Sequence, residues 1–263
     1  MNKITPIAED YIFAFQPIVR TINHSVVAHE ILLRQFQGIN TSTFLRRPGL
    51  FCDNLMQLVE SKASTLKHLM LNHQVTTSFV NFTPEQVAHE HFIASLNYFY
   101  DAGIPPSHVS LEVTEQQYAM DTDAFYANLQ VAKNNGHTIV VDDFGSGVSN
   151  FNHVKRLRPT LVKTDKSLLD SALDDSYCLD FLRNLVSFLS QIGCRVIIEG
   201  VETERHLEVA NLCSSHYLQG YYFGKPKSIG ASEHSEVNQL SSMATRLRSL
   251  LPSDKNTKQL STV

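Results

Sequence analysis

Two adjacent carboxylates, Asp142 and Asp143, end an apolar β-branched run and precede a loop that contains Gly145 and Gly147. Consecutive strand residues face opposite ways, so both carboxylates can serve one site only where the strand ends and the backbone turns. Glycine permits such a turn because it adopts positive φ without steric cost. A single Asp before Gly more often caps a helix or forms an Asx-turn. A pair repels itself unless a cation lies between, so this pair favours a divalent metal site.

Other polar residues follow the same pattern of placement along the chain. Each lies at or near the carboxyl end of a predicted strand: Glu30, Asn81, Glu112, Asp142, Asp143, Lys163, Glu199 and Gln219. Taken alone, Asn81 could cap a turn, Glu30 could be an edge-strand charge, and Lys163 could form a structural ion pair. Their convergence on one end of the predicted strands indicates a shared site.

Carboxylate and amide oxygens without His or Cys form a hard donor set, suited to Mg²⁺, Mn²⁺ or Ca²⁺ and poor for zinc. Two metals bridged by one carboxylate are a recurrent arrangement for phosphate-ester hydrolysis, and Asp142 is the natural bridge. Lys163 could hold the attacking water or a phosphoryl oxygen, and Glu199 could be the general base. Arg34 shares a strand face with Glu30 and Leu32, and its permanently charged fork suits a phosphate.

The elements that must position these residues alternate between strand and helix. Strands are predicted at 11–19, 25–34, 75–82, 108–115, 138–143, 159–165, 194–199 and 216–223. Helices are predicted at 51–71, from 84 to about 101, and at 123–134, 150–157, 177–192, 203–212 and 235–250, with a loop at 35–50. The short link between the first two strands predicts antiparallel pairing. The later alternation predicts a parallel sheet, and about eight strands in a chain of 263 residues fit a closed β/α barrel.

Composition restricts the function classes. The net charge of −4 argues against a nucleic-acid backbone as the main partner, so we expect no DNA binding. No apolar stretch approaches twenty residues, and the first residues lack a signal core, so we expect no membrane span and a cytoplasmic protein. Cys52, Cys178, Cys194 and Cys213 lack metal-site spacing and are interpreted as reduced thiols.

We predict an N-terminal extension over 1–10, one catalytic domain over 11–250, and a disordered tail over 251–263.

Short motifs occur in a fixed order along the chain: Phe15-Gln16-Pro17-Ile18, Glu30-Ile31-Leu32-Leu33-Arg34, Val80-Asn81-Phe82-Thr83-Pro84, Glu112-Val113-Thr114-Glu115, Asp142-Asp143-Phe144-Gly145-Ser146-Gly147, Lys163-Thr164-Asp165, Glu199-Gly200-Val201-Glu202-Thr203 and Gln219-Gly220-Tyr221. In this order they resemble the motifs of EAL-domain cyclic di-GMP phosphodiesterases, over residues 12 to 226.

The resemblance implies a modified TIM-type (β/α)8 barrel with one antiparallel strand that hydrolyses cyclic di-GMP to linear pGpG. It implies two divalent ions, Mg²⁺ or Mn²⁺, with Ca²⁺ expected to inhibit. Its first metal would be bound by Glu30, Asn81, Glu112 and Asp142, and its second by Asp142 and Asp143. Lys163 and Glu199 would handle the water, Gln219 would complete the site, Glu115 would support the Asp142 loop, and Gln16, Leu32 and Arg34 would touch the dinucleotide.

Three positions depart from the family pattern. Ile31 replaces Ala in the signature, Ser146 replaces Thr, and Val148 replaces Tyr. Alternation turns Ile31 away from the face of Glu30, so we expect changed packing and an intact ligand. The other two lie in the loop that, in the family, couples dimer contacts to metal binding, so the strength of an expected homodimer is put in question.

Two hypotheses from other functional classes compete with the hypothesis of an active phosphodiesterase. One is a non-catalytic EAL domain that binds cyclic di-GMP or a protein partner as a receptor or regulator. The other is a different metal-dependent barrel enzyme, such as an enolase-type acid/base catalyst. Retention of every metal-site residue favours the phosphodiesterase. Because about ten residues precede the first strand, we expect a stand-alone domain regulated by dimerisation, expression or an unidentified protein.

Overall fold

The computed structural model describes residues 11–47, 49–72, 76–113, 122–146 and 151–228. Its strands are β1 (Tyr11–Arg20), β2 (Val26–Phe36), β3 (Ile39–Asn40), β4 (Ser78–Phe82), β5 (Val109–Val113), β6 (Thr138–Phe144), β7 (Leu161–Thr164), β8 (Arg195–Ile198), β9 (Tyr217–Gln219) and β10 (Lys227–Ser228). Its helices are α1 (Thr41–Arg46), α2 (Gly49–Asp53), α3 (Leu55–Asn72), α4 (Pro84–Ala88), α5 (Phe92–Ser95), α6 (Asn97–Asp101), α7 (Asp123–Asn134), α8 (Phe151–Leu157), α9 (Lys166–Ala172), α10 (Ser176–Gln191) and α11 (Glu204–Leu212), with a 3-10 turn at Pro106–His108.

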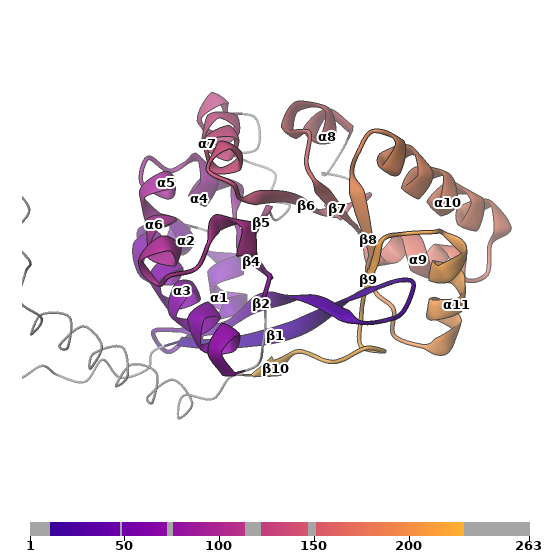
Figure 1. Cartoon of the computed structure of the whole chain (residues 1–263), viewed down its shortest axis with the longest axis horizontal. Helices are drawn as coiled ribbons and strands as arrows, with labels where there is room; N and C mark the ends of the chain where they lie inside the picture. Colours follow the sequence, from indigo (N-terminus) through magenta and orange to yellow (C-terminus); the bar gives the residue numbers. More distant parts are fainter. Residues whose placement is uncertain (1–10, 48, 73–75, 114–121, 147–150, 229–263) are drawn as a thin grey trace, which may run out of the picture.

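Eight strands close into a barrel in the order β1-β9-β8-β7-β6-β5-β4-β2, and pairing of β2 with β1 completes the ring (Figure 1). β1 runs antiparallel to both of its barrel neighbours, whereas the neighbouring pairs from β2 through β9 are parallel. The predicted α/β barrel with one antiparallel strand is therefore confirmed. β3 and β10 extend the sheet beyond the ring on β2 and β1.

The barrel interior is built in layers. Its lower layer is an apolar cluster contributed by six strands: Ile18, Ala28, Phe79, Val140, Leu161 and Ile197. Side chains alternate along a strand, so the residue two positions further on faces inward again. On the parallel strands those next positions are Glu30, Asn81, Asp142, Lys163 and Glu199, and on the antiparallel β1 the equivalent position is Gln16, two residues before Ile18. The polar residues singled out by sequence therefore form the layer directly above an apolar base.

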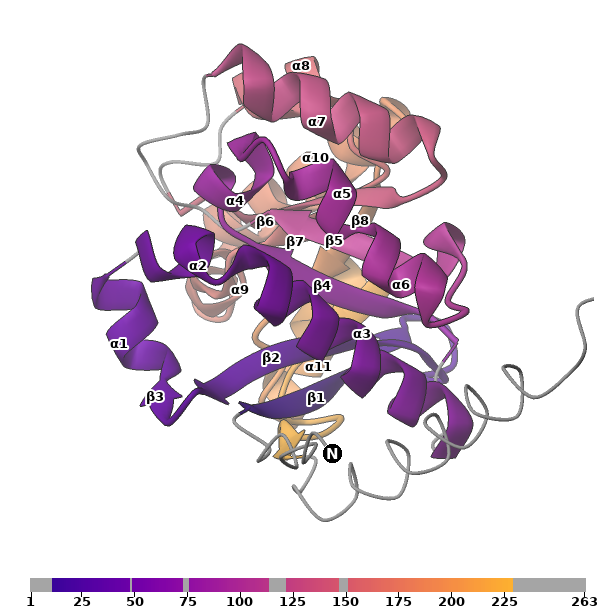
Figure 2. The same cartoon turned by 90° about the vertical axis from the view of Figure 1, so that its left-hand side faces the viewer.

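Helices cover the outside of the ring, and two larger apolar clusters lie between them and the strands. One cluster includes α3, α5 and α7 and the outer faces of β4 and β5 (Figure 2). Ile31 belongs to it and is 2% exposed, so the prediction that its side chain turns away from Glu30 is confirmed. The other cluster joins α9, α10 and α11 to β7 and β8. Within the described residues, no helix is both long enough and apolar enough to cross a bilayer.

Several predicted boundaries were wrong. Residues 35–50 are not a loop, because the Asn40 side chain accepts from the Thr43 backbone N–H at 3.0 Å and starts α1, and Phe44 buries its ring completely. The single helix predicted from 84 to about 101 is three short helices. α9 was missed although Asp165 caps it with a bond to the Ser167 N–H. The predicted helix at 235–250, the extension at 1–10 and the tail at 251–263 lie outside the described residues.

Candidate active site

Lys163 lies at the centre of the polar layer, with only 2% of its side chain exposed. Its Nζ is 3.3 Å from Glu30 Oε2, 3.3 Å from Asp142 Oδ1 and 2.9 Å from Glu199 Oε1. It also donates a short hydrogen bond to Glu112 Oε1. Four strands, β2, β5, β6 and β7, and the residue after β8 therefore bring their charged groups to one point inside the barrel.

Glu30 is the most highly connected carboxylate of this layer. It accepts hydrogen bonds from Asn81 Nδ2 at 2.9 Å and from Gln219 Nε2 at 2.7 Å. Gln219 Nε2 also lies 3.5 Å from Gln16 Oε1, and Gln16 donates to the Gly224 carbonyl at 3.2 Å. The expected position of Glu30 at a strand end was wrong. β2 continues for six further residues beyond the barrel, so Glu30 lies within it and opposite Gln16 of β1.

Burial and charge shift the pKa values of this layer in opposite directions. Burial raises the pKa of Glu112 well above its usual range, and the carboxylates of Asp142 and Glu30 raise it further. Burial also raises the pKa of Glu199 to about 8, against the opposing effect of Lys163. Burial alone would raise the pKa of Glu30, but Lys163 and two amide hydrogen bonds lower it overall. Burial alone would lower the pKa of Lys163, but the surrounding carboxylates raise it, so Lys163 remains charged.

A bulge in β6 lets Asp142 and Asp143 face the same site. Val141 pairs with Val162 and Phe144 pairs with Thr164, so β6 advances by three residues over a stretch in which β7 advances by two. Asp143 absorbs the extra residue with a φ of +48°, a left-handed conformation that Asp tolerates. Sequence reasoning assigned the turn to glycines. Gly145 does adopt a φ of +106°, but the inward placement of the second carboxylate depends on Asp143 itself.

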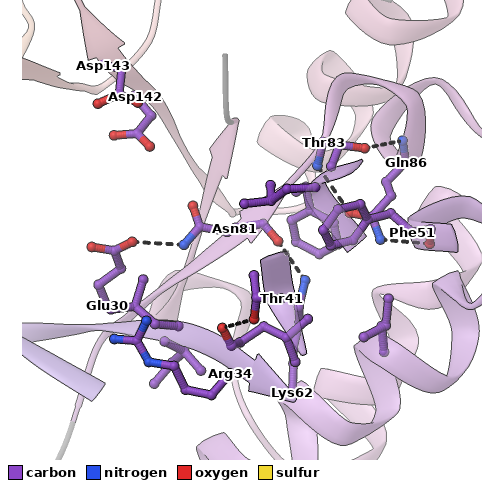
Figure 3. Close-up of a pocket in the computed structure, with 16 residues that line it drawn as sticks. Glu30, Arg34, Thr41, Phe51, Lys62, Asn81, Thr83, Gln86, Asp142 and Asp143 are labelled. Atoms are coloured by element: carbon purple, nitrogen blue, oxygen red, sulfur yellow. Dashed lines mark hydrogen bonds between the residues drawn. The ribbon is translucent and has the colours of Figure 1, made fainter. Parts of the chain in front are cut away.

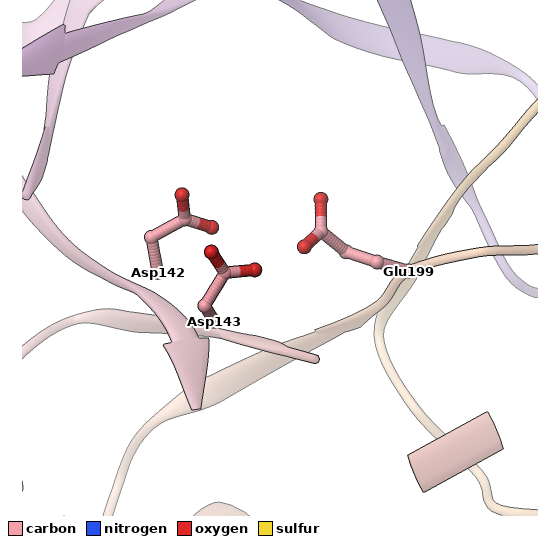
Figure 4. A group of neighbouring side chains, drawn as sticks. All are labelled: Asp142, Asp143 and Glu199. Atoms are coloured by element: carbon pink, nitrogen blue, oxygen red, sulfur yellow. The ribbon is translucent and has the colours of Figure 1, made fainter. Parts of the chain in front are cut away.

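Asp142, Asp143 and Glu199 form a second group of ligand atoms. Each offers one carboxylate oxygen, and these oxygens all lie within 4.8 Å of one another (Figure 4). Glu112 Oε2 is buried and has no hydrogen-bond partner among the described residues, so this oxygen is available to coordinate a cation. Carboxylate and amide oxygens at these spacings fit a hard divalent cation. The sequence placed Glu199 in the same site as the Asp142–Asp143 pair, with the role of a general base and not of a metal ligand.

A cavity of about 400 Å³ opens beside the acidic layer. Glu30, Asn81, Asp142 and Asp143 border it on one side, and Arg34 lies near Glu30 (Figure 3). The rest of its lining comes mainly from β2, α1, α2, α3 and the start of α4: Ile31, Leu32, Leu33, Thr41, Leu45, Phe51, Leu58, Lys62, Phe82, Thr83 and Gln86. Leu32 and Arg34 thus lie in the cavity wall, whereas Gln16 and Gln219 do not line this cavity and Gln219 donates to Glu30.

The cavity includes one residue that sequence reasoning missed. Lys62 lies within the apolar stripe of α3, between Val59 and Leu66, and it is buried. A cation at a stripe position could have been noticed from the helical period alone. Glu115, predicted to support the Asp142 loop, and Val148 lie outside the described residues.

Comparisons with known proteins agree with this architecture. Residues 5–226 match the family model described as the EAL domain. The chain is 30% identical over 222 residues to the bifunctional diguanylate cyclase/cyclic di-GMP phosphodiesterase MucR of Pseudomonas aeruginosa PAO1, covering 81% of this chain and 32% of MucR. The structure of the PaMucR phosphodiesterase in complex with c-di-GMP superposes with a TM-score of 0.72 at 27% identity, covering 82% of this chain and 92% of that one. A manganese/cy-diGMP complex of Klebsiella pneumoniae BlrP1 superposes with a TM-score of 0.72 at 23% identity, covering 87% and 58% of the two chains, and supports the fold.

An eight-stranded barrel with one antiparallel strand and a carboxylate-rich layer inside its mouth defines the structural class of this protein. The match over most of its length identifies the family: the chain belongs to the EAL domain family. Its relatives include proteins named as a bifunctional diguanylate cyclase/cyclic di-GMP phosphodiesterase, MucR, and as a probable cyclic di-GMP phosphodiesterase, PdeA of Escherichia coli K12. The chain spans about a third or less of the length of the first curated relatives that it matches.

Proposed function

We propose that this protein is a cyclic-guanylate-specific phosphodiesterase that hydrolyses cyclic di-GMP to linear pGpG with two divalent ions, Mg²⁺ or Mn²⁺. The observation that carries the proposal is the convergence of Glu30, Glu112, Asp142 and Glu199 on Lys163, with Asp143 beside them. The names of MucR and of the BlrP1 manganese complex support the substrate and the type of ion.

The ligands divide into two sets that share Asp142. Glu30, Asn81, Glu112 and Asp142 would hold the first ion, and Asp142 and Asp143 the second. The ions would supply positive charge for the phosphoryl oxygens and lower the pKa of a bound water. Asn81 would present its amide oxygen, since its Nδ2 already donates to Glu30.

Glu199 and Lys163 would handle the attacking water. The pKa of Glu199 is raised to about 8 by burial, and a base whose pKa lies near the operating pH can both accept and release a proton. Lys163 would orient the water through its ammonium, and one of its three N–H groups would turn from a carboxylate to the water when metal ions take up those carboxylates. Glu199 would therefore act mainly in the transition state.

The remaining residues would position the dinucleotide. Arg34 is an exposed residue in the wall of the cavity, and its fork matches two phosphate oxygens. Leu32 would contact a base from the same wall. Gln16 and Gln219 would act from outside this cavity, through the hydrogen bond of Gln219 to Glu30, and Glu115 would support the loop that follows β6.

The decisive experiment incubates purified protein with cyclic di-GMP and Mn²⁺ or Mg²⁺, with and without chelator, and identifies products by chromatography. We expect linear pGpG with either ion, none with chelator, and inhibition by Ca²⁺. Binding of cyclic di-GMP without any product under all of these conditions would instead identify a receptor or regulator.

We further propose that the protein is a cytoplasmic homodimer whose contacts include the loop from Asp143 to Phe151, and that a regulatory protein acts on it. Dimer contact would restrict a glycine-containing loop and pre-order Asp143. Specific activity should then rise with protein concentration across the range of dimer dissociation. Val148→Tyr should move the rise to lower concentration, and equal activity of verified monomer and dimer would refute the coupling.

A further inference from the structure

Lys62 is a buried lysine that the proposed reaction does not use. It is 6% exposed, and its Nζ donates to the Asn81 backbone carbonyl at 2.6 Å and lies 4.2 Å from the centre of the Phe82 ring. No acidic side chain of the described residues pairs with it. Lysine is almost never buried without such a partner, because burial penalises its charge. A position that carries this cost is a candidate for binding.

The surroundings of Lys62 suit a flat ring. Lys62 borders the cavity of about 400 Å³ together with the apolar side chains of Leu32, Leu45, Phe51 and Leu58. This volume is typical of small-molecule sites, which are mostly apolar with few polar groups that fix orientation. In Figure 3 the ammonium of Lys62 points toward the strand that carries Asn81. An occupant with a base in the apolar part would therefore reach the metal ligands with its phosphate.

The chemistry of Lys62 favours one purine over the other. Guanine presents two acceptors, O6 and N7, on one edge, whereas adenine presents an N6 amino donor in place of O6. A lysine nitrogen is a donor, and only one of its N–H groups is needed for the Asn81 carbonyl. We propose that Lys62 is a specificity-determining residue that donates to the O6/N7 edge of one guanine and so selects guanine over adenine. This inference rests on the proposed function.

The experiment measures calorimetric affinities for cyclic di-GMP and cyclic di-AMP in Ca²⁺ buffer, where we expect binding with little turnover. Lys62→Met removes the donor and keeps the length of the side chain. Its affinity for cyclic di-GMP should fall about tenfold while that for cyclic di-AMP changes little, since one such contact commonly gives discrimination of this order. Lys67→Met, on the same helix but outside the cavity lining, is the matched control and should keep the wild-type ratio.

Lys62→Gln is a second variant, and it covers the case in which Lys62→Met fails to fold. A glutamine amide can pair with N6 and N7 of adenine, so this variant should move the preference toward cyclic di-AMP. A purely structural Lys62 would lower both affinities by the same factor. An unchanged ratio in the folded variants would overturn the inference.

The inference and the proposed function fail in different ways. Wild-type protein that hydrolyses cyclic di-GMP, with variants that keep its base preference, would refute the role of Lys62 alone. Wild-type protein that binds no cyclic di-GMP with or without metal would refute both.

Discussion

Replacing Lys163 by Met removes the cation that lies among four carboxylates of the polar layer. The Lys163 side chain is 2% exposed, and its partners Glu30, Glu112, Asp142 and Glu199 are between 0% and 17% exposed. Water cannot replace the lost charge at such burial, so the carboxylates would repel one another or take up protons. Methionine keeps a similar length, which separates loss of charge from loss of volume.

The expected effect is large. Removing one partner from a buried ion pair costs about 3–5 kcal/mol, and each kcal/mol shifts the Tm of a domain of this size by about 2–4 °C. We therefore expect metal-free Lys163→Met to melt about 6–20 °C below wild type. The loss should be smaller at pH 5 than at pH 8. Carboxyl groups whose pKa is raised in the folded state bind more protons there than in the unfolded state, so stability falls as pH rises.

The assay is calorimetric melting in chelator and then in Mg²⁺. Lys166→Met is the matched control, because the side chain of Lys166 is 45% exposed and pairs with Glu202 at 2.8 Å. A surface pair contributes about 0–1 kcal/mol, so its Tm should change by no more than about 4 °C. Mg²⁺ should raise the Tm of Lys163→Met more than that of wild type, because the ion supplies positive charge to the same carboxylates. A metal-free Lys163→Met that melts within about 2 °C of wild type would refute the counter-ion role.

Three further predictions concern the same region. Glu30→Ala should fold but lose hydrolysis of cyclic di-GMP, because it removes an anionic ligand, and wild-type turnover by this variant would show that the metal assignment is wrong. Glu199→Gln should lower kcat far more than substrate affinity, and weak binding with normal turnover of what is bound would mark Glu199 as a binding group instead. Burial lowers the pKa of Lys62 from 10.5 to about 7, so the unfolded chain binds more protons between these values. The free energy of unfolding should therefore rise with pH in this window, by up to about 1 kcal/mol per pH unit, and denaturant titrations of Lys62→Met should lack this slope.

Local sequence signals were sufficient where a short-range rule decides the structure. The helix at 123–134 has the predicted bounds because Thr122 caps it and its apolar residues recur at helical spacing. The region from 84 to 101 failed because its apolar residues fit a helical period although the chain bends after Ala88 and Ser95. Periodicity reports which residues are buried, and it does not report where the backbone turns between them.

Membership of the polar layer could be predicted from the order of residues along each strand. Glu30, Asn81, Asp142, Lys163 and Glu199 each follow an inward-facing apolar residue by two positions, and a period of two in a strand needs no tertiary information. The family resemblance and the one antiparallel strand were also readable from local order, since β1 and β2 are joined by a link too short for a parallel crossover.

The contacts among these residues depend on tertiary packing. Closure of the ring brings Glu30 of β2 and Gln219 of β9 to within 2.7 Å although they are 189 positions apart. The bulge in β6 sets Asp143 beside Asp142, and the packing of α3 against β4 brings Lys62 to the Asn81 carbonyl. Each arrangement depends on the position of one element relative to another, and packing and backbone geometry fix that position where no local residue preference does.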